Sequence, residues 1–223
     1  MIVGERKPLA EIKAMVESYK RLLILGCGTC VSVCMAGGEK EVEVLASELR
    51  MLNKKEEREQ EIEEATIQRQ CDREYIDPCL DKIAKVDAVL SMACGVGVQF
   101  VAEVAGEGTI VLPALNTEFY GANLGAGIWA ERCAGCGQCI LHLTGGICPV
   151  ARCAKRLFNG PCGGSQRGKC EINPEVDCAW QLIYDRLKAR GQVELLEEIV
   201  PAKSWKPSLS GGPRKVKRED LLL

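Results

Sequence analysis

Cysteine is the residue that most constrains this chain. Eight of its fourteen cysteines lie between Cys133 and Cys178, in a stretch that is also rich in glycine and basic residues. Each cysteine side chain buries little apolar area, so this stretch cannot build an ordinary hydrophobic core. Something other than apolar packing must crosslink it, and the alternatives are disulfides, zinc and iron–sulfur clusters.

The surroundings of the cysteines favour metal over disulfides. The first residues, MIVGERKPLAEI, lack the apolar segment and cleavage site of a signal peptide, so we expect a cytoplasmic location with reduced thiols. No apolar run approaches the ~20 residues that a membrane helix needs, so we expect no membrane insertion. A formal net charge of −2 and 4% aromatic residues give no support to nucleic-acid binding.

The spacing of the cysteines favours iron–sulfur clusters over zinc, whose sites more often show paired C-x2-C knuckles. Cys133, Cys136 and Cys139 form a C-x2-C-x2-C run, and a Cys-Pro pair follows at Cys148, as in ferredoxins but with a longer gap. Three thiolates on such a short loop can reach three corners of a cubane, and the glycines between them let the backbone approach closely. Basic residues interleaved with the cysteines would tune an anionic cluster: Arg132, Arg152, Lys155, Arg156, Arg167 and Lys169.

Strands and helices alternate in the first half of the chain. We place the acidic run Glu56–Glu64 on a solvated face and loop. The alternation predicts an α/β domain over residues 1–112, a doubly wound parallel sheet of the flavodoxin or Rossmann type with about four strands. If their order is 2-1-3-4, the first and third strands are neighbours. The predicted strands are 21–26, 65–70, 88–93 and 109–112, and the predicted helices are about 8–16, 40–55, 76–86 and 98–105.

Cysteines follow the carboxyl ends of the predicted strands, where doubly wound sheets bind their ligands. Cys27, Cys30 and Cys34 form a C-x2-C-x3-C run after the first strand, and Cys94 follows the third. We therefore expect a [4Fe–4S] site on these four residues. Cys71 is the rival for the fourth position, because it ends the second strand.

A nucleotide site in the same loop is the weaker alternative. Gly26-Cys27-Gly28 is similar to the start of a G-x-G-x-x-G fingerprint, but Val31 stands at the third glycine position. Thiols add nothing to pyrophosphate binding, which depends on backbone amides and a helix N-terminus.

Residues 113–190 are predicted to form a small cysteine-rich domain, and 191–223 a C-terminal arm. The glycine- and aromatic-rich start, 113–132, suggests an irregular connector, or more sharply a contact surface for a cofactor or partner. Apolar spacing predicts a helix over Trp180–Leu187 that ends at Gly191. The arm cannot form its own core, so it is either disordered or laid on another subunit.

Several short motifs together resemble a known family. CAGCGQC, CP, NGPCGG, GKCE and DCAW, in this order, are similar to the C-terminal cysteine-rich family associated with methylenetetrahydrofolate reductase. Over nearly its full length, the Cys27 run included, the chain resembles the MetV-type small subunits of the acetogen form of that enzyme. The resemblance implies iron–sulfur centres and a MetF-type partner, a flavin-containing barrel with FMN that reduces 5,10-methylene-tetrahydrofolate to 5-methyl-tetrahydrofolate in the Wood–Ljungdahl pathway.

The resemblance further implies a heteromeric complex supplied with electrons by ferredoxin or by further electron-donor subunits. The chain has no room for a (β/α)8 barrel of ~250 residues, so we expect it to be an electron-transfer subunit. Two alternatives stay open: an iron–sulfur enzyme with its own open iron, and a zinc-stabilised interaction module.

We expect two or three [4Fe–4S] clusters, with zinc as the alternative in a C-terminal centre. Cys148 and Cys178 can trade places, because the fourth cysteine of a ferredoxin run often serves the other cluster. The expected C-terminal sets are Cys133, Cys136, Cys139 and Cys178 for one centre, and Cys148, Cys153, Cys162 and Cys170 for the other.

Overall fold

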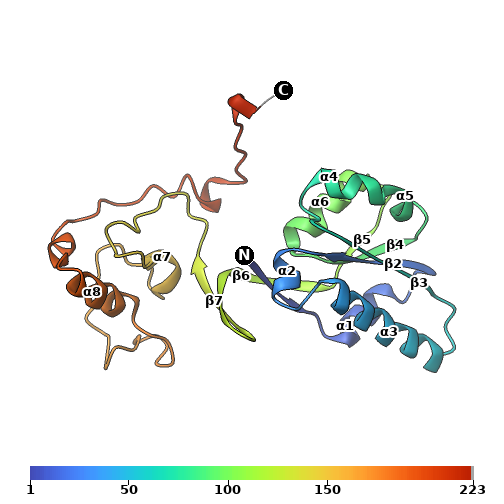
Figure 1. Cartoon of the computed structure of the whole chain (residues 1–223), viewed down its shortest axis with the longest axis horizontal. Helices are drawn as coiled ribbons and strands as arrows, with labels where there is room; N and C mark the ends of the chain where they lie inside the picture. The colour runs from blue at the N-terminus through green and yellow to red at the C-terminus, as the bar shows by residue number, and fades with distance from the viewer. Residues whose placement is uncertain (222–223) are drawn as a thin grey trace. The chain divides into compact units, whose positions relative to one another are not determined.

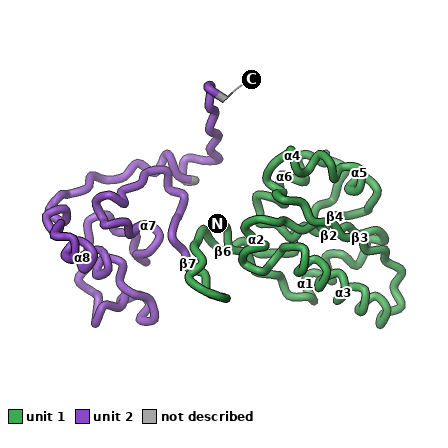
Figure 2. Tube along the Cα trace, in the orientation of Figure 1, with its two compact units in different colours: residues 1–130 green, residues 131–223 purple. Residues whose placement is uncertain are grey.

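The chain divides into two compact units, which are Met1–Ala130 and Glu131–Leu223 (Figure 2). The computed structural model describes residues 1–221, so Leu222 and Leu223, which end the predicted arm, lie outside the described residues. In the part of the chain that is described, no helix has both the length and the apolar character that crossing a bilayer requires.

A four-stranded parallel sheet forms the centre of the first unit (Figure 1). Its strand order is β3-β2-β4-β5, which corresponds to the order 2-1-3-4 of the predicted strands, so the first and third of them are neighbours. All of its pairings are parallel, as helical crossovers between the strands require. The strands are β2 (Arg21–Cys27), β3 (Glu61–Ile67), β4 (Ala88–Met92) and β5 (Val111–Pro113).

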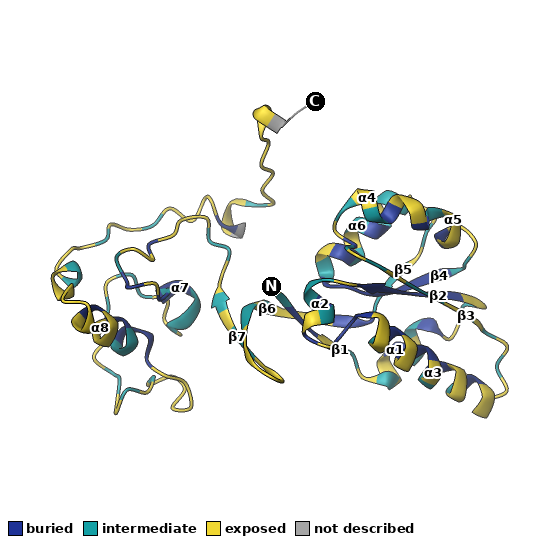
Figure 3. Cartoon of the chain, viewed as in Figure 1, coloured by how far each residue is buried: buried dark blue, intermediate teal, exposed yellow. Residues whose placement is uncertain are grey.

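Helices cover both faces of this sheet, so the side chains of β2 alternate between two cores (Figures 1 and 3). Leu22 and Ile24 pack with Leu45 on one face, and Leu23 and Leu25 pack on the other. Burial on both faces explains why β2 and β4 are nearly continuous apolar runs. The helices of this unit are α1 (Leu9–Val16), α2 (Cys30–Val33), α3 (Glu39–Lys55), α4 (Arg73–Ile76), α5 (Leu80–Ile83) and α6 (Gly95–Ala105).

The predicted solvated loop over Glu56–Glu64 is confirmed for residues 56–60, but the residues from Glu61 onward form the strand β3. β3 pairs with β2 in register from Arg21 opposite Glu61 to Cys27 opposite Ile67. It is an edge strand with alternating exposure, so its carboxylates can stay in water while intervening apolar residues face the core.

The helix predicted over 76–86 is interrupted. A 3-10 turn, η1 (Asp77–Cys79), separates α4 from α5, because Pro78 lacks the N–H that a continuous helix requires. Cys79 in this turn is 6% exposed and packs in the same core as Ile83, and burial raises the pKa of its thiol.

A second sheet corrects the expectation of an irregular connector over 113–132. Its strands are β1 (Ile2–Arg6), β6 (Leu115–Gly125) and β7 (Ile128–Cys133), in the order β1-β6-β7. β1 and β6 pair antiparallel, from Ile2 opposite Tyr120 to Arg6 opposite Leu115. Two aromatic residues of this segment, Phe119 and Trp129, lie against the core that includes Val3, whereas Tyr120 is exposed.

The second unit has little regular structure. Its core gathers around α8, where Trp180, Ile183 and Leu187 pack with Ile147 and Cys178. The helix predicted over Trp180–Leu187 is confirmed, and Gly191 follows it with φ +66°. The elements are α7 (Pro149–Arg152), α8 (Ala179–Ala189), η2 (Val193–Leu196), η3 (Leu209–Gly211) and η4 (Glu219–Leu221).

Candidate metal centres

Three thiols lie at the carboxyl edge of the parallel sheet, on neighbouring strands. Cys27 ends β2, Cys71 follows β3 and Cys94 follows β4. Cys71 is exposed as a residue, yet partial burial of its thiol, together with the nearby Cys27 and Cys94 thiols, raises its pKa. The Cys71 thiol therefore lies within electrostatic reach of both other thiols.

A buried hydrogen-bond network holds the loop after β3 against the other strand ends. Gln70 is fully buried, and its Nε2 donates to the carbonyl oxygens of Leu25 (2.7 Å) and Gly26 (3.1 Å). Its Oε1 accepts from Ser91 Oγ at 2.6 Å, and Ser91 Oγ accepts from the Ala93 N–H at 3.3 Å. The loops that carry Cys71 and Cys94 are thus tied to the end of β2 by satisfied polar groups.

Glycines let the loop after β2 fold back closely over the sheet. The Cys27 N–H donates to the Gly37 carbonyl oxygen at 2.8 Å. A Cβ at Gly37 would collide with the carbonyl oxygen of Met92, and one at Gly26 would lie 2.7 Å from Val42 Cγ2. Only glycine fits at these two points.

The other two cysteines of the expected N-terminal set lie differently. Cys30 begins α2 and is half-buried. Cys34 follows α2, is 6% exposed, and has its Sγ 3.6 Å from the Gly4 carbonyl oxygen and 3.5 Å from that of Val31. The sulfur of Cys34 is therefore engaged by the backbone of β1 and α2.

Arg69 places a cation beside this edge. Its Nη2 lies 3.2 Å from the Tyr75 hydroxyl oxygen and 3.5 Å from Asp72 Oδ2, and its guanidinium stacks 4.9 Å from the Tyr75 ring centre. Its Nε is buried and has no hydrogen-bond partner among residues 1–221. The guanidinium also acts to lower the pKa of Cys71, although burial outweighs it. A cation with a free buried donor beside thiols suits an anionic cluster.

In the second unit, one backbone amide of the C-x2-C-x2-C loop donates to a thiol of the same loop. The Gly135 N–H donates to Cys133 Sγ at 3.3 Å, and Cys136 Sγ lies 3.6 Å from the Gln138 carbonyl oxygen. Gly135 has φ +60° and Gly137 has φ +78°, so both glycines hold a left-handed backbone. Amide-to-sulfur hydrogen bonds of this kind tune iron–sulfur centres.

The chain from Lys203 to Arg214, here called the strap, lies over this same loop. Lys203 Nζ donates to the Cys136 carbonyl oxygen at 3.0 Å and lies 5.3 Å from the Trp205 ring centre. Arg214 Nη1 donates to the Gly135 carbonyl oxygen at 2.9 Å. A Cβ atom added at Gly137 would lie 2.8 Å from the Cβ atom of Pro207. The strap thus contacts its own unit, where we had expected a disordered segment or an arm on another subunit.

The remaining C-terminal cysteines gather around α7 and the loop before α8. Cys148 and Cys153 cap the two ends of α7, and Cys153 and Cys170 line one cavity of about 310 Å³ together with Arg152. The backbone N–H groups of Ile172 and then Asn173 lower the pKa of Cys170. Cys162 Sγ lies 3.7 Å from a Glu171 carboxylate oxygen that also pairs with Lys155, and Cys178 caps α8 and is 8% exposed.

Among residues 1–221, no three His, Cys, Asp or Glu side chains lie close enough together to hold a metal ion. A cubane cluster binds one thiolate at each iron, so its ligands do not converge on a single point. The donor set nevertheless suits clusters, because it combines thiols, backbone amides aimed at sulfur, and nearby cations.

Gln70, Ser91 and Arg69 did not emerge as site residues from the sequence. The sequence feature that could have indicated Ser91 is its position as a polar residue within the otherwise apolar run AVLSMA. A buried polar residue needs a partner, and only the fold shows which one it has.

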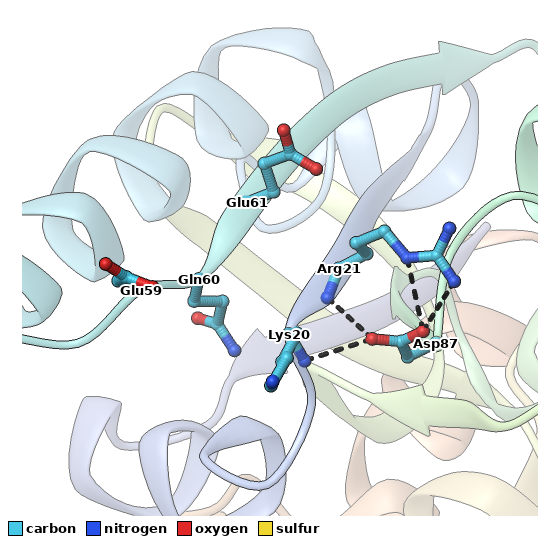
Figure 4. Close-up of a pocket in the computed structure, with 6 residues that line it drawn as sticks. All are labelled: Lys20, Arg21, Glu59, Gln60, Glu61 and Asp87. Carbon is cyan, nitrogen blue, oxygen red and sulfur yellow. Dashed lines mark hydrogen bonds and ion pairs between the residues drawn. The ribbon is translucent and has the colours of Figure 1, made fainter.

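The opposite edge of the sheet carries a polar cavity of about 590 Å³ with no thiol in its lining (Figure 4). Arg21 and Asp87 meet there: Arg21 Nη2 donates to Asp87 Oδ1 at 2.9 Å, and the Arg21 N–H donates to Oδ2 at 2.8 Å. Asp87 also accepts from the Lys20 N–H at 3.1 Å. Since Arg21 and Asp87 pair with each other at the starts of β2 and β4, these two charges have a structural role.

Comparison with known proteins gives one similarity. The family model described as methylene-tetrahydrofolate reductase C terminal matches residues 112–206. The match covers less than half of the chain and leaves the parallel sheet outside it, apart from the end of β5. No curated protein and no solved structure matches the chain.

Proposed function

We propose that this chain is the iron–sulfur electron-transfer subunit of a cytoplasmic methylenetetrahydrofolate reductase complex. The observation that carries the proposal is the position of the family match: residues 112–206 include all eight cysteines of the dense stretch. A cytoplasmic chain keeps such thiols reduced and available to metal. The thiols, amide-to-sulfur contacts and cations described above are the features that hold and tune iron–sulfur centres.

The folate chemistry belongs to a partner in this proposal. The partner is a MetF-type flavoprotein with FMN, which reduces 5,10-methylene-tetrahydrofolate to 5-methyl-tetrahydrofolate. In this reaction the substrate takes up two electrons and two protons. Ferredoxin or a further donor subunit supplies the electrons. When bound, [4Fe–4S] clusters would provide one-electron transfer between donor and flavin.

The C-terminal residues have distinct parts in this function. Cys133, Cys136, Cys139 and Cys178 hold one centre, and the other four C-terminal cysteines hold the second as a cluster or as zinc. The Gly135 amide orients toward Cys133 Sγ, and Arg152 adds positive charge beside Cys153 and Cys170. A reduced cluster is more negative than an oxidised one, so these cations and amides favour uptake of an electron.

The test is anaerobic purification of the full chain followed by iron, zinc and acid-labile sulfide analysis, with EPR of the dithionite-reduced protein. We expect about eight or more irons per chain with matching sulfide, and reduced-cluster signals that disappear on reoxidation by a flavoprotein partner. Zinc with little sulfide would overturn the electron-transfer role and leave a structural subunit. Clusters that reduce methylene-tetrahydrofolate without any flavin partner would overturn it in favour of an enzyme in its own right.

A further inference from the structure

We propose that the first unit holds an iron–sulfur cluster on Cys27, Cys30, Cys71 and Cys94, and that Cys34 is not a ligand. This inference rests on the proposed function, because it assigns the ligands of one of its clusters. It replaces one residue of the set expected from the sequence, Cys34, by a thiol from another strand.

Sheet topology brings the three strand-end thiols to one edge. β2 lies between β3 and β4, and all three strands are parallel, so their carboxyl ends lie side by side. Cys27 is in register with Ile67, and its neighbour Gly26 is in register with Met92. Cys94 follows Met92 by two residues, so Cys27 lies at the end of β2 and Cys94 just beyond the end of the adjacent strand β4.

The loop after β3 is folded back toward β2, which brings Cys71 to the same place. Cys27 Sγ lies 4.0 Å from the Gln68 carbonyl oxygen, and the Gly28 N–H donates to the Ile67 carbonyl oxygen at 2.9 Å. The buried amide of Gln70, next to Cys71 in sequence, fixes this fold by bonding both β2 and Ser91.

The electrostatic surroundings suit a bound anion. Cys94 is the N-cap of α6, an eleven-residue helix whose N-terminus favours a thiolate. Arg69 has a buried Nε with no partner among residues 1–221, two positions before Cys71. A buried N–H group without a hydrogen-bond partner normally lowers the stability of the fold, and a sulfur atom of a cluster would accept a hydrogen bond from it.

Cys30 supplies the fourth thiol, and Cys34 does not. Cys30 follows Cys27 at the C-x2-C spacing by which two thiols of one loop reach two irons of one cluster, and it is half-buried. Cys34 follows α2, and its thiol contacts the carbonyl oxygens of Gly4 in β1 and Val31 in α2. To become a ligand it would have to leave both contacts.

Matched cysteine variants of the full chain test the assignment. Cys71→Ala, Cys34→Ala and the control Cys79→Ala are compared for iron, sulfide and EPR signals after anaerobic purification. We expect Cys71→Ala to lose about four irons per chain, and the other two variants to keep the wild-type content. Loss in Cys34→Ala with retention in Cys71→Ala would overturn the inference in favour of the sequence-based set.

A second measurement keeps the test valid if a variant does not fold. Wild-type holoprotein is alkylated before and after removal of iron by a chelator, and each cysteine is quantified by mass spectrometry. We expect Cys71, which is exposed in this structure, to react at least tenfold more slowly before iron is removed. Equal rates would overturn the inference.

The two proposals fail in different ways. Wild-type protein without iron and sulfide overturns the proposed function together with this inference. Wild-type protein with all of its iron in the C-terminal centres, detected as full retention in both Cys71→Ala and Cys94→Ala, overturns the inference alone.

Discussion

Ser91 Oγ donates a 2.6 Å hydrogen bond to Gln70 Oε1, and neither residue has any solvent exposure. The bond joins the end of β4 to the loop after β3, although these two strands are not neighbours in the sheet. Gln70 bridges the distance by also bonding the two last carbonyls before Cys27. The side-chain amide of Gln70 thus holds together the three segments that carry Cys27, Cys71 and Cys94.

Replacing Gln70 by leucine is expected to lower the free energy of unfolding by about 2–3 kcal/mol, because buried partners are left without hydrogen bonds. It should also reduce iron bound in the first unit. The matched control is Gln60→Leu, because Gln60 Nε2 donates to the carbonyl oxygens of Val16 (2.9 Å) and Tyr19 (2.7 Å) near the opposite edge. Urea denaturation and iron analysis distinguish them: Gln60→Leu destabilises at unchanged iron content. Equal iron loss in both variants would show that general instability is the cause.

Gly37→Ala is expected to destabilise the first unit by about 3 kcal/mol or more, since the new Cβ would collide with the Met92 carbonyl oxygen. Gly108→Ala is the control, because a Cβ there meets nothing within 4 Å and the residue is exposed. Thermal unfolding followed by circular dichroism measures both. A Gly37 variant as stable as the Gly108 variant would mean that the loop after β2 does not pack as described.

Acid should weaken the pairing of Arg21 with Asp87. Hydrogen bonds from the Arg21 side chain and then from its backbone hold the pKa of Asp87 below its usual value. The pair therefore stabilises the fold above the unfolded-state pKa of about 3.9, and this contribution is lost as pH falls through the lower folded-state pKa.

Asp87→Asn should therefore be less stable than wild type at pH 7, with a gap that closes as the pH falls below about 4. Urea unfolding between pH 3 and pH 7 measures it. Glu103→Gln, at an exposed position of α6 with no ion pair to the described residues, should show no such convergence. A constant gap for Asp87→Asn across this range would contradict the prediction.

Lys203→Met is expected to make the reduction potential of the nearest C-terminal centre more negative, because it removes a cation from the Cys133–Cys139 loop. An interaction on the order of 1 kcal/mol at a protein surface corresponds to about 40 mV for one electron. An EPR-monitored redox titration measures the shift. Lys215→Met, at an exposed position further along the chain, should leave the potential unchanged. Equal shifts in the two variants would show that the potential responds only to the net charge of the protein.

The parallel sheet was predictable because burial on two faces demands long apolar runs, and Leu22–Leu25 and Ala88–Leu90 stand out in any reading. β3 was placed too late because an edge strand needs only one apolar face, and its alternation is hidden among glutamates. The pairing of β1 with β6 could not be predicted, because its partners lie far apart in the sequence and no local pattern joins them.

The candidate sites, like the fold, were predictable from the sequence only in part. The number and spacing of the cysteines indicate metal without any structure, because few other roles require so many thiols. Which thiols share a centre depends on strand order and loop direction, which the spacing of the cysteines does not give.

The strap also sets an order of events during synthesis. Lys203 and Arg214 cover a loop that was made some seventy residues earlier. The ribosome therefore exposes the cysteine loop before it releases the strap that covers it. Until the strap is made, the loop on the nascent chain is open to iron and sulfide.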